Sequence, residues 1–110
     1  MELVINTCFG GFSLSRAAHS RLGSVYVEAQ EDPFITVGYW DTSSWDQGLD
    51  NYTVEYRSLP ALVDAVKLLC AEAAGSHARL KVVEVPDDAK VYISEYDGRE
   101  VVREVHRAWG

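Results

Sequence analysis

The chain is 110 residues long, which is enough for one hydrophobic core and too short for two domains. Its apolar fraction of 47% and charged fraction of 25% are those of an ordinary globular protein, and no apolar run reaches the ~20 residues that span a bilayer. The formal net charge of −7 argues against direct binding to nucleic acid, because this composition does not neutralise phosphates.

The acidity has two interpretations. A negative surface suits a basic protein partner, including a protein that normally holds nucleic acid. The same charge also keeps a small protein soluble whatever its partners are. The first residues lack the basic and apolar segments of a secretory signal, so we expect a cytoplasmic protein that makes no membrane contact.

The N-terminal part predicts a strand, a glycine turn and a helix. Residues 2–6 are mostly apolar and predict a short buried strand, which the glycine pair at 10–11 ends. A helix is expected over residues 16–22. Ser15 can accept a hydrogen bond from its first turn, and Gly23 is a typical C-terminal stop.

The middle of the chain predicts a hairpin and one more strand. Segments 25–29 and 34–40 are rich in β-branched and aromatic side chains, which favours two paired strands with a turn between them. A polar run follows, and within it Trp45 is expected to be exposed because polar residues flank it. Residues 51–57 alternate in polarity and predict a further strand.

The clearest helix signal comes next. Ser58 can cap a helix over residues 60–75, and Pro60 fits its first turn. Residues 79–85 then predict a strand. The apolar stripe of the helix consists of Leu62, Val63, Val66, Leu69, Cys70 and Ala73.

Asp97 and Gly98 tolerate the positive φ angles of a type I′ turn, and their β-branched and aromatic neighbours favour a hairpin. A rival interpretation makes residues 101–109 a short helix, because apolar side chains recur there at helical spacing. In the hairpin, the expected partners are residues 96 and 99, 95 and 100, 94 and 101, 93 and 102, and 92 and 103.

Together these elements predict one α+β domain over residues 1–110. We expect two layers: an antiparallel or mixed sheet of about five or six strands, with two helices packed on one face. Both termini would belong to the sheet.

The two ends of the chain carry distinctive motifs, INTCFGGFSLS at the start and EYDGREVVREVHRAW after LKVVEVPDD at the end. With them the chain resembles a family of small, largely uncharacterised proteins that recur in bacteriophage and prophage genomes. That family joins an Asn-x-Cys-x-Gly-Gly-Phe segment to a Glu-Tyr-Asp-Gly segment with a terminal His-Arg-x-Trp. The matching residues are Asn6, Cys8, Gly10, Gly11, Phe12, Glu95, Tyr96, Asp97, Gly98, Glu100, Glu104, His106, Arg107 and Trp109.

The resemblance implies an accessory phage or prophage product that acts in the cytoplasm of a bacterial host. It carries no agreed activity with it. Small acidic proteins of that origin include inhibitors of host defence, anti-CRISPR proteins among them, so the implied target is a nucleic-acid-handling defence complex.

An enzyme is the alternative. Cys8 lies ahead of a helix start, where a thiolate is stabilised, and His106 could serve as its base if the termini meet. The same cysteine also fits a half-buried structural position, because no third member of a catalytic set is evident. Cys8 and Cys70 are expected to be free thiols in an intracellular protein.

Three carboxylates, Glu95, Glu100 and Glu104, share one face of the predicted hairpin with His106. Such a cluster can bind a divalent ion, but the usual spacings of metal ligands are absent. A solvated strand face with arginines nearby explains the same residues, and no metal or cofactor is predicted.

The stretch YWDTSSWDQGLDNYTVEY, residues 39–56, interleaves aromatic with acidic side chains. Tyr and Trp anchor protein interfaces, so the favoured function is non-enzymatic binding to a host protein with a basic surface. Some of these aromatic side chains could instead form core. A virion assembly protein is a third possibility, although no heptad pattern supports it, and the oligomeric state is not predicted. The predicted partner-binding residues are Tyr39, Trp40, Asp41, Trp45, Asp46, Asp50 and Glu55.

Overall fold

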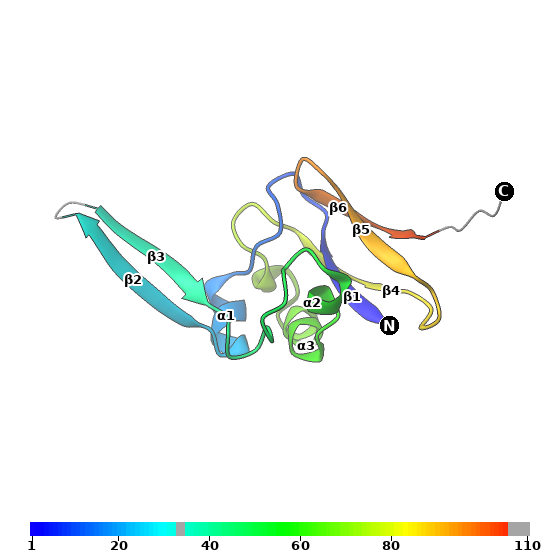
Figure 1. The fold of residues 1–110 in the computed structure, drawn as a ribbon, viewed down its shortest axis with the longest axis horizontal. Helices are drawn as coiled ribbons and strands as arrows, with labels where there is room; N and C mark the ends of the chain where they lie inside the picture. Colours follow the sequence, from blue (N-terminus) through cyan, green and yellow to red (C-terminus); the bar gives the residue numbers. More distant parts are fainter. Residues whose placement is uncertain (33–34, 106–110) are drawn as a thin grey trace.

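A computed structural model describes the backbone of residues 1–32 and 35–105 and, within these ranges, all side chains except those of residues 29–32 and 35–36. The described chain contains helices and strands in mixed order, which confirms the α+β class (Figure 1). None of its helices is long and apolar enough to cross a membrane. The elements are β1 (Glu2–Asn6), α1 (Arg16–Leu22), β2 (Val25–Asp32), β3 (Ile35–Asp41), α2 (Val54–Arg57), α3 (Pro60–Leu69), the 3₁₀ helix η1 (Cys70–Ala73), β4 (Leu80–Glu84), β5 (Val91–Tyr96) and β6 (Arg99–Glu104).

The described strands do not form the single sheet that the sequence led us to expect. They form three two-stranded antiparallel sheets, β1 with β4, β2 with β3 and β5 with β6. Helix α3 packs against β1 and β4, and α1 packs against α3. Strands β1 and β6 lie side by side, but a side chain of β6 rather than its backbone reaches the edge of β1. The β1–β4 sheet and the β5–β6 sheet are therefore joined through side chains.

Helix α1 begins and ends where its capping residues predict. The hydroxyl of Ser15 accepts a hydrogen bond from the amide of Ala18 at 3.1 Å, and Gly23 adopts φ 85° at the C-terminal cap. The start of this helix is tied to the end of η1, because the amide of Ser15 donates to the carbonyl of Ala73 at 2.9 Å.

The second predicted helix is shorter than expected. Pro60 lies at its first turn as predicted, but Leu59, not Ser58, is the N-cap residue and makes no side-chain capping bond. Helix α3 stops at Leu69, and Cys70 turns to φ 53° before η1 continues the chain. Cys70 is therefore exposed and does not belong to the buried stripe, although both Cys8 and Cys70 are free thiols as predicted.

The prediction of a strand over residues 51–57 is wrong. The hydroxyl of Thr53 accepts a hydrogen bond from the amide of Tyr56 at 3.2 Å, which caps the short helix α2. Its own hydroxyl proton goes to the carbonyl of Asp50 at 2.7 Å. Side chains that hydrogen-bond nearby backbone compete with a strand ladder, and here the resulting helix buries Tyr56 and Arg57.

The C-terminal hairpin has the predicted register at every pair from Tyr92 with Arg103 to Tyr96 with Arg99. Asp97 and Gly98 have φ angles of 53° and 87°, as a type I′ turn requires. Gly98 also has no room for a side chain, because a Cβ atom there would lie 2.4 Å from the carbonyl oxygen of Phe9. Strand β6 replaces the rival helix over residues 101–104, and residues 106–109 lie outside the described chain.

Asn6 connects the N-terminal and C-terminal parts of the chain through hydrogen bonds. This fully buried side chain donates from its amide to the carbonyls of Cys8 at 2.6 Å and Gly98 at 2.7 Å. Its oxygen accepts from the amides of Cys8 and Arg79. The two terminal motifs therefore meet in space, and Asn6 has a structural role at their junction.

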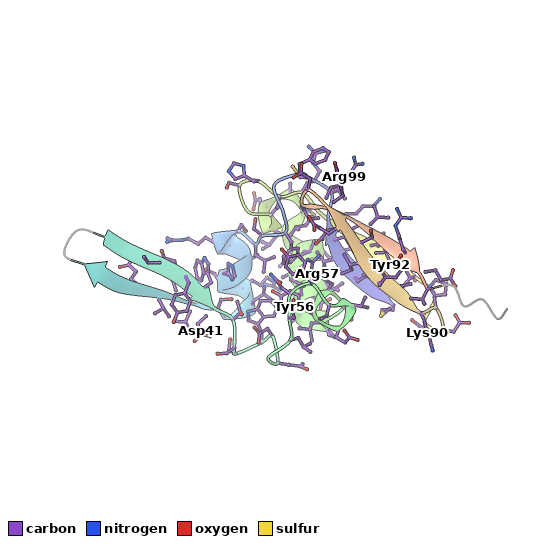
Figure 2. The ribbon with its side chains drawn as sticks, turned by 45° about the horizontal axis from the view of Figure 1, so that its top comes forward. Asp41, Tyr56, Arg57, Lys90, Tyr92 and Arg99 are labelled. Carbon is purple, nitrogen blue, oxygen red and sulfur yellow. The ribbon has the colours of Figure 1, made fainter. Side chains whose placement is uncertain are left out.

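A buried ion pair lies at the centre of the molecule, where Figure 2 labels Arg57 next to Tyr56. Both side chains of the pair, Arg57 and Glu100, are 0% exposed. The guanidinium contacts both carboxylate oxygens at 2.5 and 2.8 Å and stacks 3.7 Å from the centre of the Phe12 ring. The interpretation of this strand face as solvated is thus wrong for Glu100, because its side chain is buried and its cation comes from α2.

We predict that Glu100→Gln lowers the free energy of unfolding by about 3–5 kcal/mol, because the buried guanidinium of Arg57 would lose its counter-charge. Urea unfolding followed by circular dichroism measures the change. Glu104→Gln is the matched control, since Glu104 is exposed on the same strand and should change stability by less than about 0.5 kcal/mol. Equal losses in the two variants would contradict a structural role for the pair.

Candidate functional site

The β2–β3 hairpin, which we call the arm, extends away from the rest of the molecule along its longest dimension of 61 Å (Figure 1). Because Val27 is paired with Tyr39, and Val25 with Asp41, these side chains share one face of the ribbon. Val25 is 60% exposed, Tyr39 55% and Val37 41%. This outer face of the arm is therefore an apolar surface that the described chain does not cover.

The opposite face of the arm is anchored at its base. Trp40 stacks on His19 of α1, with ring centres 4.5 Å apart and planes within 8° of parallel. Tyr26 meets the same indole edge-on at 5.0 Å. Of the predicted binding residues, Trp40 is thus half-buried and fixes the arm, whereas Tyr39 is available for contact.

The whole formal net charge of the chain is located in and after the arm. Residues 24–56 contain seven acidic side chains and no lysine or arginine, whereas the remaining residues contain ten acidic and ten basic side chains. The ion pairs found among the described residues use the carboxylates of Glu2, Asp87 and Glu100, all outside this segment. The acidic residues of the segment are Glu28, Glu31, Asp32, Asp41, Asp46, Asp50 and Glu55.

Two of the predicted aspartates, Asp41 and Asp50, also shape the loop after the arm. Asp41 accepts hydrogen bonds from the amide and hydroxyl of Ser43, and these bonds hold the pKa of its carboxyl below the usual range. Asp50 accepts from the amide of Tyr52 at 2.8 Å. Asp41 and Asp50 remain exposed, as does Glu55 on α2, so all three side chains are accessible to a partner.

The expectation that Trp45 is exposed is wrong. Its side chain is only 8% exposed and belongs to the core cluster with Tyr56, whose ring centre lies 5.4 Å away. Its indole N–H donates to the hydroxyl of Ser24 at 2.9 Å. The polar residues that flank Trp45 face solvent while the loop folds its ring inward, so Trp45 is a core residue and not an interface anchor.

A pocket of about 480 Å³ opens at the base of the arm. Its walls come from the loop before α1, from α1 itself, from the end of β3, from residues 42–53, which we call the acidic loop, and from α2. Two of the predicted partner-binding residues, Trp40 and Asp46, line it, but the pocket itself was not predicted, because no local pattern links segments so far apart in the chain. The lining residues are Phe12, Ser13, Leu14, His19, Trp40, Thr42, Asp46, Leu49, Asn51 and Tyr56.

Two lining groups stay neutral. Burial lowers the pKa of His19, whose Nδ1 lies 2.8 Å from the hydroxyl of Ser24. Burial raises the pKa of Tyr56 to about 12; the neighbouring Arg57 opposes this shift, and Asp46 adds to it. At neutral pH the pocket therefore contains an uncharged imidazole and a protonated phenol.

The described chain brings no catalytic partner to Cys8. This half-buried residue lies in a turn whose backbone is held by Asn6, and α1 begins only at Arg16. His106, the base of the alternative enzyme, lies outside the described residues, so that alternative stays a prediction. Of the predicted carboxylate cluster, Glu100 is committed to Arg57. No group of three or more potential metal ligands occurs in the described part of the chain.

We predict that Trp45→Ala lowers the free energy of unfolding by about 3–5 kcal/mol, because a large buried ring is removed and a cavity is left. Chemical denaturation measures the loss. Trp40→Ala removes an indole that is only half-buried at the base of the arm and should cost less. A Trp45→Ala protein as stable as the parent would place this ring in solvent after all.

A second prediction concerns pH. Because the folded state lowers the pKa of His19, the unfolded chain takes up a proton near pH 6.5 that the folded chain resists. This contribution to stability is complete above about pH 6.5 and declines as the pH falls below it. We expect the free energy of unfolding to fall between pH 7.5 and 5.5, and to fall less in His19→Phe, which keeps a ring against Trp40.

The matched control for this measurement is His77→Phe, which removes an exposed histidine and should retain the pH dependence of the parent. Thermal unfolding at both pH values gives the comparison. If His19→Phe and the parent lose equal stability on acidification, the burial of a neutral His19 is not the cause.

Comparison with protein-family models, curated proteins and solved structures found no match to this chain.

Proposed function

We propose that this protein acts by binding another protein through the outer face of the arm and the acidic loop beside it. The observation that carries the proposal is the concentration of the entire net charge in residues 24–56, next to an exposed apolar face. An isolated two-stranded hairpin is at best marginally stable in water, so an arm of this kind is typical of a surface that a partner completes.

The negative charge of residues 24–56 favours a partner with a basic surface. Seven carboxylates in a segment without lysine or arginine attract a basic protein and repel the phosphates of nucleic acid. Tyr39 supplies an aromatic anchor at the centre of this surface, and Asp41 supplies a carboxylate at its base, where Figure 2 labels it. The predicted binding surface therefore keeps Tyr39, Asp41, Asp50 and Glu55 and loses Trp45.

We further propose that the partner is a nucleic-acid-handling protein of a host defence complex, inhibited in the bacterial cytoplasm by an accessory phage or prophage product. Two features support this step. The terminal motifs resemble those of small phage proteins, and an acidic surface fits a basic site that normally holds nucleic acid.

The test compares two double variants with the same chemical changes on different hairpins. Tyr39→Ala with Asp41→Asn alters the proposed surface, and asparagine can still accept the turn-forming bonds from Ser43. Tyr96→Ala with Asp97→Asn alters the other hairpin, where Tyr96 is 81% exposed and asparagine tolerates the turn. Affinity capture from lysate of the bacterial host identifies the partner, and calorimetry with the purified partner measures each affinity.

We expect the arm variant to weaken binding about 30-fold or more, because anchor residues of this kind contribute about 2 kcal/mol each or more. The control variant should bind as the parent does. Affinity should also fall as salt is raised from 50 to 500 mM. Parent-like affinity in the arm variant, or salt-independent binding, would contradict the surface assigned here.

A further inference from the structure

The pocket at the base of the arm has one fixed charge. Asp46 provides the one carboxylate among the described lining residues, and His19 and Tyr56 are neutral near pH 7. None of the described residues that line it is a lysine or an arginine. A pocket with a single carboxylate favours a cation over an anion or a neutral ligand.

The carboxylate of Asp46 is held in a defined orientation. Its Oδ2 accepts from the hydroxyl of Thr42 at 2.6 Å, and its Oδ1 accepts from the amide of Gly48 at 2.9 Å. Each oxygen has lone-pair capacity left for a further donor. A carboxylate fixed at both oxygens and open to a second bond at each matches the two parallel N–H groups of a guanidinium.

Aromatic rings provide the other half of a cation site. Phe12, Trp40 and Tyr56 contribute to the walls. Aromatic faces attract cations, and the planar guanidinium of arginine stacks on them better than the compact ammonium of lysine. The core already contains a guanidinium held by an aromatic ring and a carboxylate. There Arg57 stacks on the Phe12 ring and donates a hydrogen bond to each carboxylate oxygen of Glu100.

We infer that this pocket receives an arginine side chain of the protein partner. The inference rests on the proposed function, because it names the chemistry of one anchor on the surface proposed there. The pocket borders that surface through the loop after β3, because Thr42 and Asp46 of this loop line it, whereas Trp40 lines it from the face of β3 opposite to Tyr39. A partner segment lying along the arm would reach the pocket at its base.

The first experiment uses the unaltered protein and a probe of known chemistry. Capped arginine, N-acetyl-arginine N-methylamide, is titrated into isotope-labelled protein and followed by the amide and indole signals of the pocket residues. We expect saturable shifts at Trp40, Asp46 and Leu49, with a dissociation constant on the order of 1 mM for so small a ligand. Capped citrulline, which has the same shape without the charge, should bind about tenfold more weakly or worse.

Three outcomes of this titration would overturn the inference. They are equal binding of arginine and citrulline, tighter binding of capped lysine than of capped arginine, and shifts that map away from the pocket. Because the comparison needs no mutation, it decides the question even where a pocket variant fails to fold.

The second experiment changes Asp46 alone. Asp46→Asn keeps an oxygen for the amide of Gly48 and an amide group for the hydroxyl of Thr42, so the loop should keep its shape. We expect capped arginine to bind about tenfold more weakly or worse. Asp64→Asn is the matched control, because it removes one exposed carboxylate from α3, and its affinity for the probe should equal that of the parent.

Binding to the purified partner separates this inference from the proposed function. If Asp46→Asn binds the partner as tightly as the parent while the arm variant does not, the arginine pocket is wrong and the arm surface stands. If capped arginine fills the pocket while the arm variant binds the partner normally, the proposed surface is wrong and the pocket keeps its cation chemistry. Weakened partner binding by both variants supports both.

Discussion

The buried ion pair between Arg57 and Glu100 joins parts of the molecule that share no backbone ladder. The described strands form separate two-stranded sheets, so side chains must fix how β1 sits against β6. Glu100 accepts from the amide of Asn6 at 2.7 Å, and Arg57 donates to the carbonyl of Val4 at 3.2 Å. Burying two charges costs solvation that their attraction only partly offsets. In return the ion pair fixes the position of β6 relative to β1 and α2, because any shift between them would leave a buried charge without its partner.

The elements that the sequence predicts well are those whose signals lie within a few residues. Ser15 and Gly23 bound α1 because each satisfies backbone groups of the adjacent turn. Asp97 and Gly98 set the register of β5 and β6 because a two-residue turn leaves no freedom in the pairing. In both cases a short stretch of chain carries the information, and tertiary contacts do not override it.

The features that escaped prediction depend on residues far apart in the chain. Residues 51–57 alternate like a strand, but a strand would not bring Arg57 to Glu100, 43 residues further on. Trp45 has polar neighbours on both sides, and only the hydroxyl of Ser24 and the ring of Tyr56 explain its burial. The pocket itself was not predicted: the acidic and aromatic composition marked Trp40 and Asp46 as binding residues, whereas nothing local marked His19.

The arm combines two properties that a solitary protein would avoid. Seven carboxylates within residues 24–56 repel one another, and an exposed apolar ribbon with free edges invites unwanted strand pairing. Solubility accounts for the charge but not for the exposed Val25, Val37 and Tyr39. Two copies of the chain would bring like charges together if their arms met, so self-pairing of arms covers the apolar face only at an electrostatic cost. A basic partner would both offset the repulsion among the carboxylates and cover the apolar face. This is the physical reason for placing the interaction surface on the arm.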